Sequence, residues 1–550
     1  MGPELIILFL AAALICVLLS GFPVSFVLGG VSLIAAYIGV YFGVFNESVL
    51  GGVHQQVEGV MESRPLLAVP LFVFMGLVLE RSQIAEELLS TMGRLFGSLR
   101  GGLAISVCIV GALLAASTGI VGATVVTMGL LSLPTMLKAG YNKELATGTI
   151  CASGTLGQLI PPSIVLIILG DQMQSAYDKA TRDPAFDCDR LTQWSPCENL
   201  HSVSVSELFA GAFIPGLVLV SLYILYILIV AWFKPSYAPA AREKGEVDPG
   251  LLRDVAVALL PPLFLIVAVL GSILLGVATP TEAAAIGATV AMLIAAIKLW
   301  DNKLRWLVFA STVSIVLIVG IVLYGRVTGA YDLRPTRANV SDFEWTLIYI
   351  LFGLIAVFAA GVAVAVFYLG FKRPENDQGV KNSRPILIDV IYGTLKVSTM
   401  VFVILIGARA LTTVFVGFHG DTVVKDFLTS LPGGFTVQIM VVMLIMFLLG
   451  FFLDFIEIAF IVVPIVAPIL LLSGINPVWL GVLFAMNLQT SFLTPPFGFA
   501  LFYLRGVAPP EVKTSHIYKG IIPFVMIQIV GLCVLYYFEG LATWLPGLMF

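Results

Sequence analysis

The sequence predicts an all-α polytopic membrane protein made of two inverted repeats, each with a re-entrant hairpin and a transmembrane helix broken by Pro-Pro. The first observation is composition: 59% of the 550 residues are hydrophobic and only 11% are charged, whereas a soluble domain carries about 25% charged residues. The second is a series of apolar runs of the length that spans a bilayer, about 17–25 residues. The third is a long motif that occurs once in each half of the chain.

The two copies of this motif cover residues 115–169 and 449–504. Each copy has a proline, a Gly-x-Asn turn and a Pro-Pro pair, and the matched positions are all 334 residues apart. The pairs are Pro161-Pro162 and Pro495-Pro496. Interrupted apolar segments at corresponding places in two halves are the best sequence indication of a transporter's binding site. The alternative is that these residues only kink the helices, but two copies in register favour a binding role.

The first repeat is expected to cover residues 1–233. Its first apolar run lacks the basic start of a cleaved signal, so we expect a retained helix. The predicted elements are spans at 4–20, 24–43 and 65–80, an amphipathic surface helix at 84–97, a re-entrant hairpin at about 102–136, a broken helix at 144–169 and a span at 207–233.

A polar linker at 234–252 precedes the second repeat, residues 253–550. The offset between the halves is 257 at Pro23 and Pro280 but 334 at the broken helices, which predicts an insertion of about 77 residues. The predicted elements are spans at 254–276 and 283–300, two inserted spans within about 306–371, a span at 386–418, a short amphipathic piece at 420–430, a hairpin at about 434–470, a broken helix at 477–504 and a last span at 520–545.

The distribution of Lys and Arg predicts the orientation. If each hairpin enters and leaves by one face, the connections on one side hold 19 of these residues and those on the other hold 8. The positive-inside rule makes the first side cytoplasmic, and its connections are 81–101, 138–143, 234–253, 298–305, 372–384 and 505–519. The acidic connection 171–206 then faces outward, where Cys188 and Cys197 can form a disulfide or remain free thiols. That connection either steers a basic partner or is simply solvated.

The breaks predict the chemistry of the site. Unwound backbone survives at membrane depth only where it lines a cavity or binds something, and the carbonyls freed by Pro-Pro can coordinate a desolvated Na⁺. Small hydroxyl and amide side chains surround both breaks, with Gln158 among them. The predicted substrate-binding residues are Ser117, Ser153, Thr155, Asp454, Asn487, Gln489 and Thr490.

Charged residues at membrane depth have two interpretations. Asp454 and Glu457, at the second hairpin's turn, are either functional or caps of free backbone N–H groups, and capping is favoured for Glu457. Arg409 lies in a span and either has a function or reaches the interface by snorkelling. Glu282 follows a plausible helix start, where an acid interacts favourably with the helix dipole.

Four segments of the sequence resemble one known family. The segments are PLFVFMG at 70–76, SGTLGQLIPPSI at 153–164, GVATPTEAAA at 276–285, and the block from the second hairpin to TPPFG. Together they resemble the large membrane subunit of tripartite ATP-independent periplasmic (TRAP) transporters, the DctM-like family. The resemblance implies an elevator-type ion transporter fold, in which a transport domain moves against a scaffold in the bacterial inner membrane. It also implies Na⁺-driven import of an organic acid, with a small four-helix membrane subunit and a periplasmic substrate-binding protein as partners.

The resemblance also implies Na⁺ sites. The first would use carbonyls around Ala115, Thr118, Gly157, Ile160 and Pro162. The register of 334 extends this to a second site near Leu449, Gly450, Phe452, Ser491, Thr494 and Pro496. Two features depart from the family pattern: the long connection 171–206, and the inserted spans 306–371. Two spans are too few for a fused small subunit, so these are expected to face lipid or a partner.

Other classes of function fit less well. With four histidines and no HExxH, Cys/His cluster or nucleophile elbow, an intramembrane enzyme is not expected, nor is an organic cofactor. The absence of a basic arm argues against nucleic acid, and a channel would need no inverted, Pro-broken pair. A stand-alone Na⁺/carboxylate symporter without a binding protein remains the alternative. The solute itself is not fixed by the sequence.

Overall fold

The computed structural model describes residues 3–119, 121–183, 203–241, 250–299, 305–328, 331, 341–373, 384–496 and 498–550. Every regular element in these ranges is a helix, as expected for an all-α protein. Cys188 and Cys197 lie outside the described residues, so their pairing stays a prediction.

The N-terminal elements contain one helix that the sequence did not predict. They are α1 Pro3–Leu19, α2 Val24–Tyr41, α3 Ser48–Glu62, the 3-10 helix η1 Pro65–Leu67 and α4 Ala68–Arg81. Helix α3 was missed because polar residues such as His54 and Glu58 interrupt its apolar pattern. It meets η1 and α4 at an angle of 56°, and the extended backbone of Ser63 ends it just before the turn.

The next elements contain the first hairpin and the first broken helix. They are α5 Ile84–Phe96, α6 Gly102–Thr118, α7 Val121–Lys138, α8 Lys143–Thr155, η2 Leu156–Gln158, α9 Ile164–Ala180 and α10 Val205–Phe233. Helix α9 continues past residue 169, where the apolar run ends and the broken helix was predicted to end. The extension is polar in sequence, yet Gln172, Met173, Ala176 and Tyr177 are buried against the rest of the protein.

The second half begins with two long helices and ends with a long helix followed by a short one. Its elements are α11 Leu251–Leu274, α12 Pro280–Leu299, α13 Arg305–Thr328, α14 Asp342–Phe371, α15 Ile386–Gly417, α16 Gly420–Ser430, α17 Gly434–Leu449, α18 Phe455–Ile461, α19 Val463–Leu471, α20 Pro477–Leu493, α21 Phe499–Val507, α22 Thr514–Tyr537 and α23 Gly540–Met549. The single last span predicted at 520–545 is wrong, because α22 ends at Tyr537 and Phe538 leaves the helical conformation before α23 begins.

Matched positions of the two sequence copies have the same local structure. Asn142 caps α8 by accepting hydrogen bonds from two backbone N–H groups, and Asn476 caps α20 in the same way. Gly140 and Gly474 both have positive φ values, 80° and 66°, which glycine adopts without steric cost. The inverted orientation of the two copies and the division of the chain into two repeats stay predictions.

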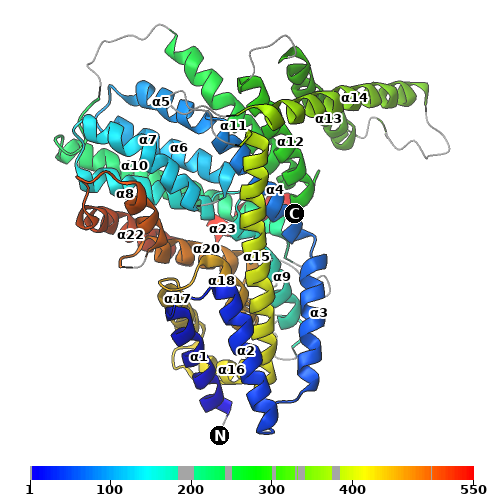
Figure 1. The fold of residues 1–550 in the computed structure, drawn as a ribbon, viewed down its shortest axis with the longest axis vertical. Helices are drawn as coiled ribbons and strands as arrows, with labels where there is room; N and C mark the ends of the chain where they lie inside the picture. The colour runs from blue at the N-terminus through cyan, green and yellow to red at the C-terminus, as the bar shows by residue number, and fades with distance from the viewer. Residues whose placement is uncertain are drawn as a thin grey trace.

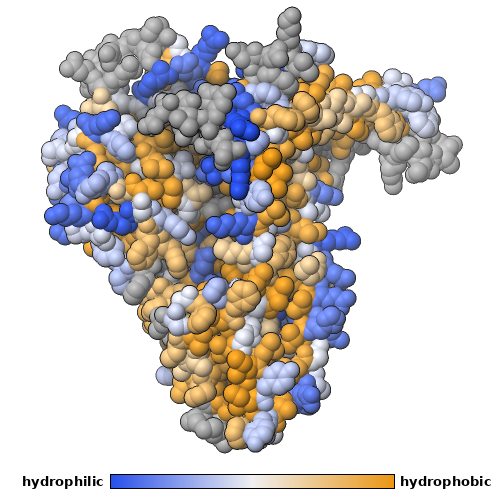
Figure 2. All heavy atoms as spheres, viewed as in Figure 1, coloured by the Kyte–Doolittle hydropathy of each residue, from blue (hydrophilic) through white to orange (hydrophobic). Residues whose placement is uncertain are grey.

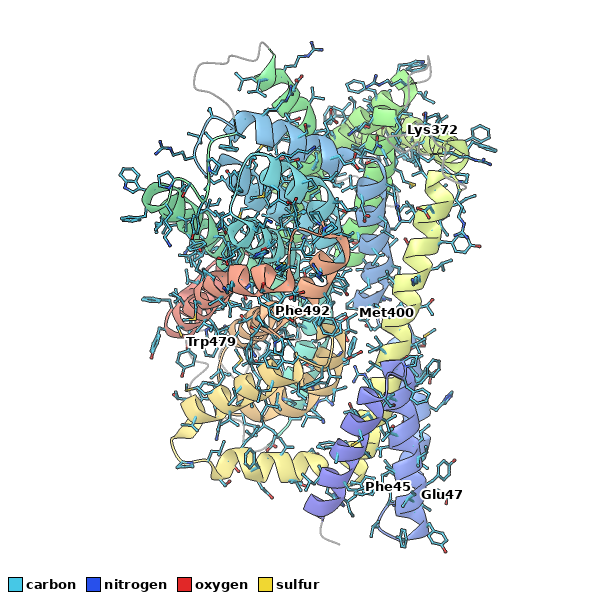
Figure 3. The ribbon with its side chains drawn as sticks, turned by 60° about the vertical axis from the view of Figure 1, so that its left-hand side comes forward. Phe45, Glu47, Lys372, Met400, Trp479 and Phe492 are labelled. Carbon is cyan, nitrogen blue, oxygen red and sulfur yellow. The ribbon has the colours of Figure 1, made fainter. Side chains whose placement is uncertain are left out.

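Helix α15 is the longest helix and runs along most of the molecule (Figures 1 and 3). Helices α1, α2, α3 and α16 lie around its lower part in Figure 1, and α4 packs along its upper part. The ring of Phe45, after α2, contacts that of Phe418, after α15, with centroids 4.8 Å apart. Met400 marks the middle of α15 in Figure 3. Helices α6, α7, α8, α17, α18 and α20 lie to the left of this column in Figure 1, whereas α9 is seen between α15 and α3.

The surface is that of a polytopic membrane protein. Within the described ranges, nine helices are long and apolar enough to cross a membrane, or ten if the bent α3–α4 pair is one span. Helices α13 and α14 pack on each other and extend away from the body, where their apolar side chains are exposed (Figures 1 and 2). Trp306, Tyr349 and Phe371 are all mostly exposed there. Such a surface matches the expectation that these inserted helices face lipid or a partner.

Candidate transport site at the two broken helices

The first broken helix is interrupted inside the protein core. Helix α8 tightens into η2, and residues 159–163 are irregular before α9 begins at Ile164. All residues from 145 to 170 are buried. The hydroxyl of Ser163 accepts a hydrogen bond from the backbone N–H of Leu166 and donates to the carbonyl of Gln158 at 2.8 Å. This side chain therefore caps α9 and ties it back to η2 across the break.

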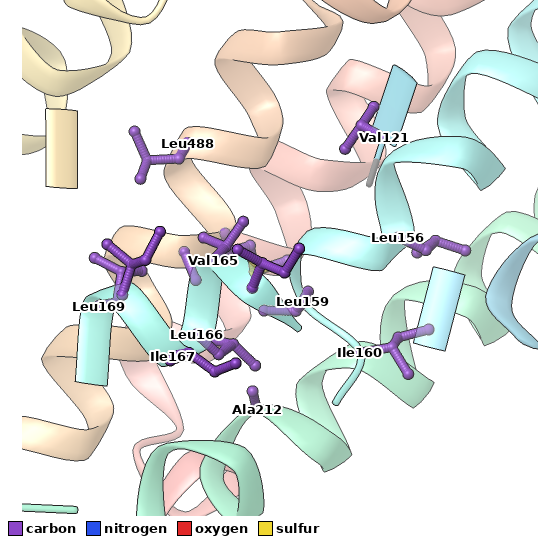
Figure 4. Packing of buried hydrophobic residues seen from close by; sticks show 14 of the residues in the cluster. Val121, Leu156, Leu159, Ile160, Val165, Leu166, Ile167, Leu169, Ala212 and Leu488 are labelled. Carbon is purple, nitrogen blue, oxygen red and sulfur yellow. The ribbon is translucent and has the colours of Figure 1, made fainter. Parts of the chain in front are cut away.

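Apolar side chains close the space around this break. Figure 4 shows Leu156, Leu159 and Ile160 around the interruption, with Val121 of α7 and Leu488 of α20 on other sides. All five are buried. The unwound backbone thus lies in a water-poor environment, where a polar group without a partner is costly.

Five carbonyl oxygens in the break have no hydrogen-bond donor among the described residues, those of Gly157, Leu159, Ile160, Pro161 and Pro162. Three of these residues, Gly157, Ile160 and Pro162, are members of the predicted first Na⁺ site. A neighbouring carbonyl, that of Leu156, accepts from Leu159 and Ile160 and so is satisfied. Unpaired, buried carbonyls are the ligand type that a hard cation such as Na⁺ prefers. The residues present at this first site therefore fit the ion.

The tip of the first hairpin lies against the break. A Cβ added to Gly119, between α6 and α7, would lie 3.2 Å from Cγ1 of Ile164 at the start of α9. A Cβ added to Gly154 would lie 2.3 Å from Cγ2 of Val125 on α7. Both glycines therefore allow a close approach that a larger residue would prevent. The other predicted members of the site, Ala115, Ser117 and Thr118, form the last turn of α6, and their side chains lie outside the described structure.

The second hairpin contacts the second broken helix through its own tip. A Cβ added to Gly450, at the end of α17, would lie 2.1 Å from the hydroxyl of Ser491 on α20. The amide of Asn487 donates to the carbonyl of Met443 on α17 at 2.8 Å. These contacts bring together three residues predicted for the second Na⁺ site or for the substrate, and fix hairpin two on α20.

The backbone at the second predicted Na⁺ site is more fully hydrogen-bonded. The carbonyls of Leu449, Ser491, Thr494 and Pro496 all accept hydrogen bonds, the last from the hydroxyl of Tyr518 at 2.9 Å. The side chain of Phe452 is 53% exposed. Each carbonyl keeps a second lone pair, but this set offers a cation less than the first. The second Na⁺ site stays a prediction, and the local geometry favours it less than the first Na⁺ site.

The two acids of the second hairpin act as caps. The carboxylate of Asp454 accepts from the backbone N–H of Phe455 at 2.7 Å, and that of Glu457 accepts from the N–H of Asp454 at 3.0 Å. Together they form a capping box at the start of α18. Capping was the favoured interpretation for Glu457. Capping also explains why an acid is present at Asp454, and the substrate-binding role of Asp454 stays a prediction.

The two broken helices meet at matched positions of the two copies. The amide nitrogen of Gln489 donates to the hydroxyl of Thr155 at 3.4 Å, and these residues are 334 apart. The amide oxygen of Gln489 is buried and has no hydrogen-bond partner among the described residues. The amide nitrogen and oxygen of Gln158 are also buried and also have no partner there. A buried unsatisfied amide is rare and calls for an explanation. A bound polar ligand that hydrogen-bonds these three amide atoms of Gln158 and Gln489 would explain why they are unpaired at this junction.

Other predicted substrate-binding hydroxyls are already engaged. Ser153 donates to the carbonyl of Thr149 at 2.6 Å and lies 3.3 Å from Sγ of Cys108. Thr490 donates to the carbonyl of Met486 within its own helix. Their roles at the site stay predictions. Gln158 was noted near the break but not included in the predicted substrate set, although an amide beside Pro-Pro was the signal that could have placed it there.

A polar cluster joins the first broken helix to the column around α15. The carboxylate of Asp171 on α9 accepts from the hydroxyl of Ser63 at 2.9 Å and from the amide of Gln172 at 2.8 Å. Arg409 of α15 lies close enough to interact with it electrostatically. Nε of Arg409 is buried and has no hydrogen-bond partner among the described residues. Farther along, Lys425 of α16 pairs with Asp183 at 3.0 Å.

The second hairpin faces the column around α15 through apolar residues. A cavity of about 310 Å³ separates α1 and α15 from the second hairpin. Its lining consists of Ile7, Leu10, Ala11, Leu14, Leu411, Phe415, Leu448, Leu449, Phe452, Leu453, Ile461, Val462 and Ile465. Hairpin two therefore meets the column through side chains that form no specific polar bond.

A polytopic helical protein with two helices interrupted in this way has the architecture of a secondary membrane transporter. The chain belongs to the family described as the tripartite ATP-independent periplasmic transporter, DctM component, whose model matches residues 11–180, 199–325 and 303–541. It is therefore a TRAP transporter large permease component, as the sequence motifs predicted, and not an enzyme.

Several curated relatives extend along most of the chain. A C4-dicarboxylate TRAP transporter large permease protein DctM from Vibrio cholerae is 27% identical over 491 residues, which cover 88% of this chain and 86% of that one. The ectoine TRAP transporter large permease protein TeaC from Halomonas elongata is 24% identical, covering 98% and 99%. The sialic acid TRAP transporter permease protein SiaT from Haemophilus influenzae is 23% identical, covering 93% and 64%.

The fold is shared with solved structures, and one of them illustrates the likeness. The YdaH transporter of Alcanivorax borkumensis, described as having an unusual topology, superposes with a TM-score of 0.53 over 98% of each chain. The sequence identity is 14%, so this likeness concerns the fold alone.

Proposed function

We propose that this protein is the permease subunit of a Na⁺-driven importer of an organic acid in the bacterial inner membrane. The observation that carries the proposal is the break in the first broken helix, where five buried carbonyls and the amide of Gln158 have no partner among the described residues. Na⁺ bound there would supply positive charge beside the junction of the two broken helices. Family membership and the relatives named for C4-dicarboxylate and sialic acid support an organic acid as the solute.

The residues of the junction have distinct roles in this proposal. The carbonyls of Gly157, Ile160 and Pro162 would hold Na⁺ from the side of the break, with the backbone of the hairpin tip opposite. The amides of Gln158 and Gln489 would hydrogen-bond the solute. The surrounding leucine, isoleucine and valine side chains exclude water, which strengthens each of these electrostatic contacts.

The proposed movement is of the elevator type. The two hairpins and two broken helices would move as one body against the column formed by α1, α2, α3, α4 and α15. Besides the packing of α15 on α18 and of α4 on α6, the contacts between these parts include one apolar cavity and a few polar pairs. The hairpins contact the broken helices through tightly packed glycines, which supports this division. A small membrane subunit and a periplasmic substrate-binding protein are the proposed partners.

Reconstitution tests the proposal. The chain and its small subunit are placed in proteoliposomes, the cognate binding protein is added outside, and uptake of that binding protein's ligand is followed. We expect uptake that requires an inward Na⁺ gradient and no ATP. Uptake that continues without any Na⁺ gradient would refute the coupling. Full-rate uptake without the binding protein would instead support a stand-alone Na⁺/carboxylate symporter.

A further inference from the structure

A large cavity among the described residues is separate from the transport site. It has a volume of about 660 Å³ and lies between α5, α6 and α7, at the base of the first hairpin. It is lined by Glu86, Leu89, Ser90, Gly93, Arg94, Gly97, Leu103, Ser106, Val107, Leu131, Ser132, Thr135, Met136, Lys138, Ala139 and Ala241. Ser106 is eleven residues before Ser117 on α6, which is about 16 Å along a helix. The cavity is thus well removed from the hairpin tip.

One polar side chain in this cavity lacks a partner. Ser132, on α7, is only 3% exposed, and its hydroxyl makes no hydrogen bond within the described structure. The other buried hydroxyl in the lining, that of Ser106, donates to the carbonyls of Met92 and Gly102. A hydroxyl that is buried, unpaired and on the wall of a large cavity indicates a ligand that accepts or donates a hydrogen bond.

Among the charged residues of the cavity lining, Lys138 and Glu86 have no ion pair within the described residues, so one cation and one carboxylate are available. Arg94 is paired with Asp254 on α11 at 2.6 Å. On the same helix, Glu87 is paired with Lys298 on α12 at 2.6 Å. These two pairs fix α5 in place. Lys138 is exposed, and within the described part of the chain it has no ion pair or hydrogen bond.

The remainder of the lining is largely apolar, with Leu89, Leu103, Val107, Leu131 and Met136 prominent. An apolar slot with an unpaired lysine at the end that holds Ser132, and with Glu86 on α5, matches an amphiphile whose anionic head contacts the lysine and whose hydrocarbon tail lies along the apolar wall. A compact dicarboxylate would gain nothing from the apolar walls. The predicted topology places Lys138 and α5 on the cytoplasmic side, where anionic phospholipids attract juxtamembrane lysines.

We propose that the cavity between α5 and the first hairpin binds one anionic phospholipid. Lys138 contacts the phosphate, Ser132 hydrogen-bonds a glycerol or ester oxygen, and one acyl chain lies along Leu89, Leu131 and Met136. The lipid fills the space between a helix held by two ion pairs and the base of the hairpin. Lipid binding is measured on the purified protein, so this proposal stands or falls independently of Na⁺ coupling and of the solute.

The test is the melting temperature of the purified detergent-solubilised chain during titration with phosphatidylglycerol, or with phosphatidylcholine of the same acyl chains. We expect phosphatidylglycerol to raise the melting temperature with saturation, and phosphatidylcholine to have a smaller effect. Lys138→Gln should raise the half-saturating concentration of phosphatidylglycerol about fivefold, because one lysine near an anionic headgroup contributes about 1 kcal/mol. Thr135→Trp, which fills the cavity from an exposed position, should abolish the saturable effect.

Lys519→Gln is the matched control, because Lys519 is also an exposed lysine with no ion pair or hydrogen bond within the described residues and lies on the same predicted side. It should titrate like the unchanged protein. Each variant must first give one symmetric gel-filtration peak. Equal half-saturation in Lys138→Gln and Lys519→Gln would overturn the proposal. So would equal effects of the two lipids, or stabilisation by millimolar succinate that depends on Lys138, since the cavity would then hold a free organic acid.

Discussion

The amide of Gln158 is buried at 0% exposure, and neither of its polar atoms has a partner among the described residues. Leaving a buried polar group unsatisfied costs about 1–3 kcal/mol. The same position in the second copy, 334 residues on, is Phe492, so an apolar residue is compatible with this fold. A costly amide at a position where an apolar residue fits is best explained by a ligand that satisfies it.

Replacing Gln158 with leucine tests this interpretation. We expect the melting temperature of the solute-free protein to stay the same or rise, because an unsatisfied amide is replaced by an apolar group of similar size. Uptake in proteoliposomes should fall by about tenfold, the cost of one lost hydrogen bond of about 1.4 kcal/mol.

Gln528→Leu is the matched control for that substitution. Gln528 is equally buried, but its amide nitrogen donates to the hydroxyl of Tyr223 at 2.8 Å, so only its amide oxygen lacks a partner among the described residues. Its loss should lower the melting temperature, because the hydroxyl of Tyr223 is left buried without this partner. If Gln158→Leu destabilises the protein as much as Gln528→Leu does, Gln158 is a structural residue and not a ligand-binding one.

Gly450 illustrates how tightly hairpin two contacts its helix. A Cβ at this position would lie 2.1 Å from Oγ and 2.6 Å from Cβ of Ser491. Gly450→Ala should therefore destabilise the protein by about 1–3 kcal/mol through overpacking, measured as a lower melting temperature. Adding Ser491→Gly should recover part of this loss, because both overlapping atoms are then absent.

Gly271→Ala is the control for the glycine change. Gly271 lies within α11 and has no atom within 4 Å of an added Cβ. Alanine is the better helix former by up to about 1 kcal/mol, so this variant should be neutral or slightly more stable. Equal melting temperatures for Gly450→Ala and Gly271→Ala would contradict the close contact between the hairpin tip and α20.

At the scale of elements, periodicity and turn residues predicted most helices, while tertiary packing determined the rest. The Gly-x-Asn turns and Pro-Pro pairs are local signals, and they located the caps of α8 and α20 and the breaks that follow. Helix α3 and the end of α9 carry many polar residues, so their sequences resemble loops. Their helices are stabilised by contacts that no local pattern encodes, such as Ser63 with Asp171, 108 residues apart.

The same distinction applies to the site. The register of 334 places Thr155 and Gln489 at corresponding points, and the structure brings them together. The hydrogen-bond state of each carbonyl could not be read from the sequence, since it depends on donors such as Tyr518 and on the exact path of the chain at each break. This explains why the predicted Na⁺ ligands of the first break are unpaired carbonyls, whereas most of the corresponding carbonyls of the second site accept hydrogen bonds.

The apolar cavity between α1 and hairpin two predicts a variant that blocks movement. Ala11 lines this cavity of about 310 Å³ from an exposed position on α1. Ala11→Trp should fill it and fix the hairpin against the column. We expect normal expression and melting temperature but uptake at least about tenfold lower, because most molecules would remain in one state.

Ala12→Trp provides the comparison, since Ala12 is the next residue, is also exposed and does not line the cavity. It should transport at the unchanged rate. Equal uptake by the two variants would mean that this cavity does not change shape during transport.

At the scale of the whole molecule, the proposed moving body and the column are joined by few polar contacts. The hydrogen bond between Ser63 and Asp171 connects the turn after α3 to α9, and the pair of Lys425 and Asp183 connects α16 to the residues after α9. A rigid-body movement has to break or rearrange such contacts, and the cost of about 1 kcal/mol for an ordinary hydrogen bond is compatible with rapid exchange between states. A covalent bond at the same place is not.

Cross-linking α3 to α9 therefore tests the elevator movement directly. In a protein whose six cysteines are replaced by serine or alanine, Ser63→Cys and Asp171→Cys place two thiols where side-chain atoms lie 2.9 Å apart. A short bifunctional thiol reagent with a cleavable disulfide should join them, and uptake should fall in proportion to the cross-linked fraction. Cleaving the reagent should restore uptake to the level of the untreated double variant.

The control cross-link lies within the column. A Cβ added to Gly393 of α15 would lie 2.8 Å from Cδ1 of Leu77 on α4, so Leu77→Cys with Gly393→Cys joins two helices that are proposed to stay together. The same reagent should leave uptake by this pair unchanged. Both cross-links use the same reagent, and they differ only in whether they join the column to the proposed moving body. Full uptake with the Ser63–Asp171 link in place would therefore mean that α9 does not move against α3. The solute would then have to cross by opening and closing of the hairpins alone.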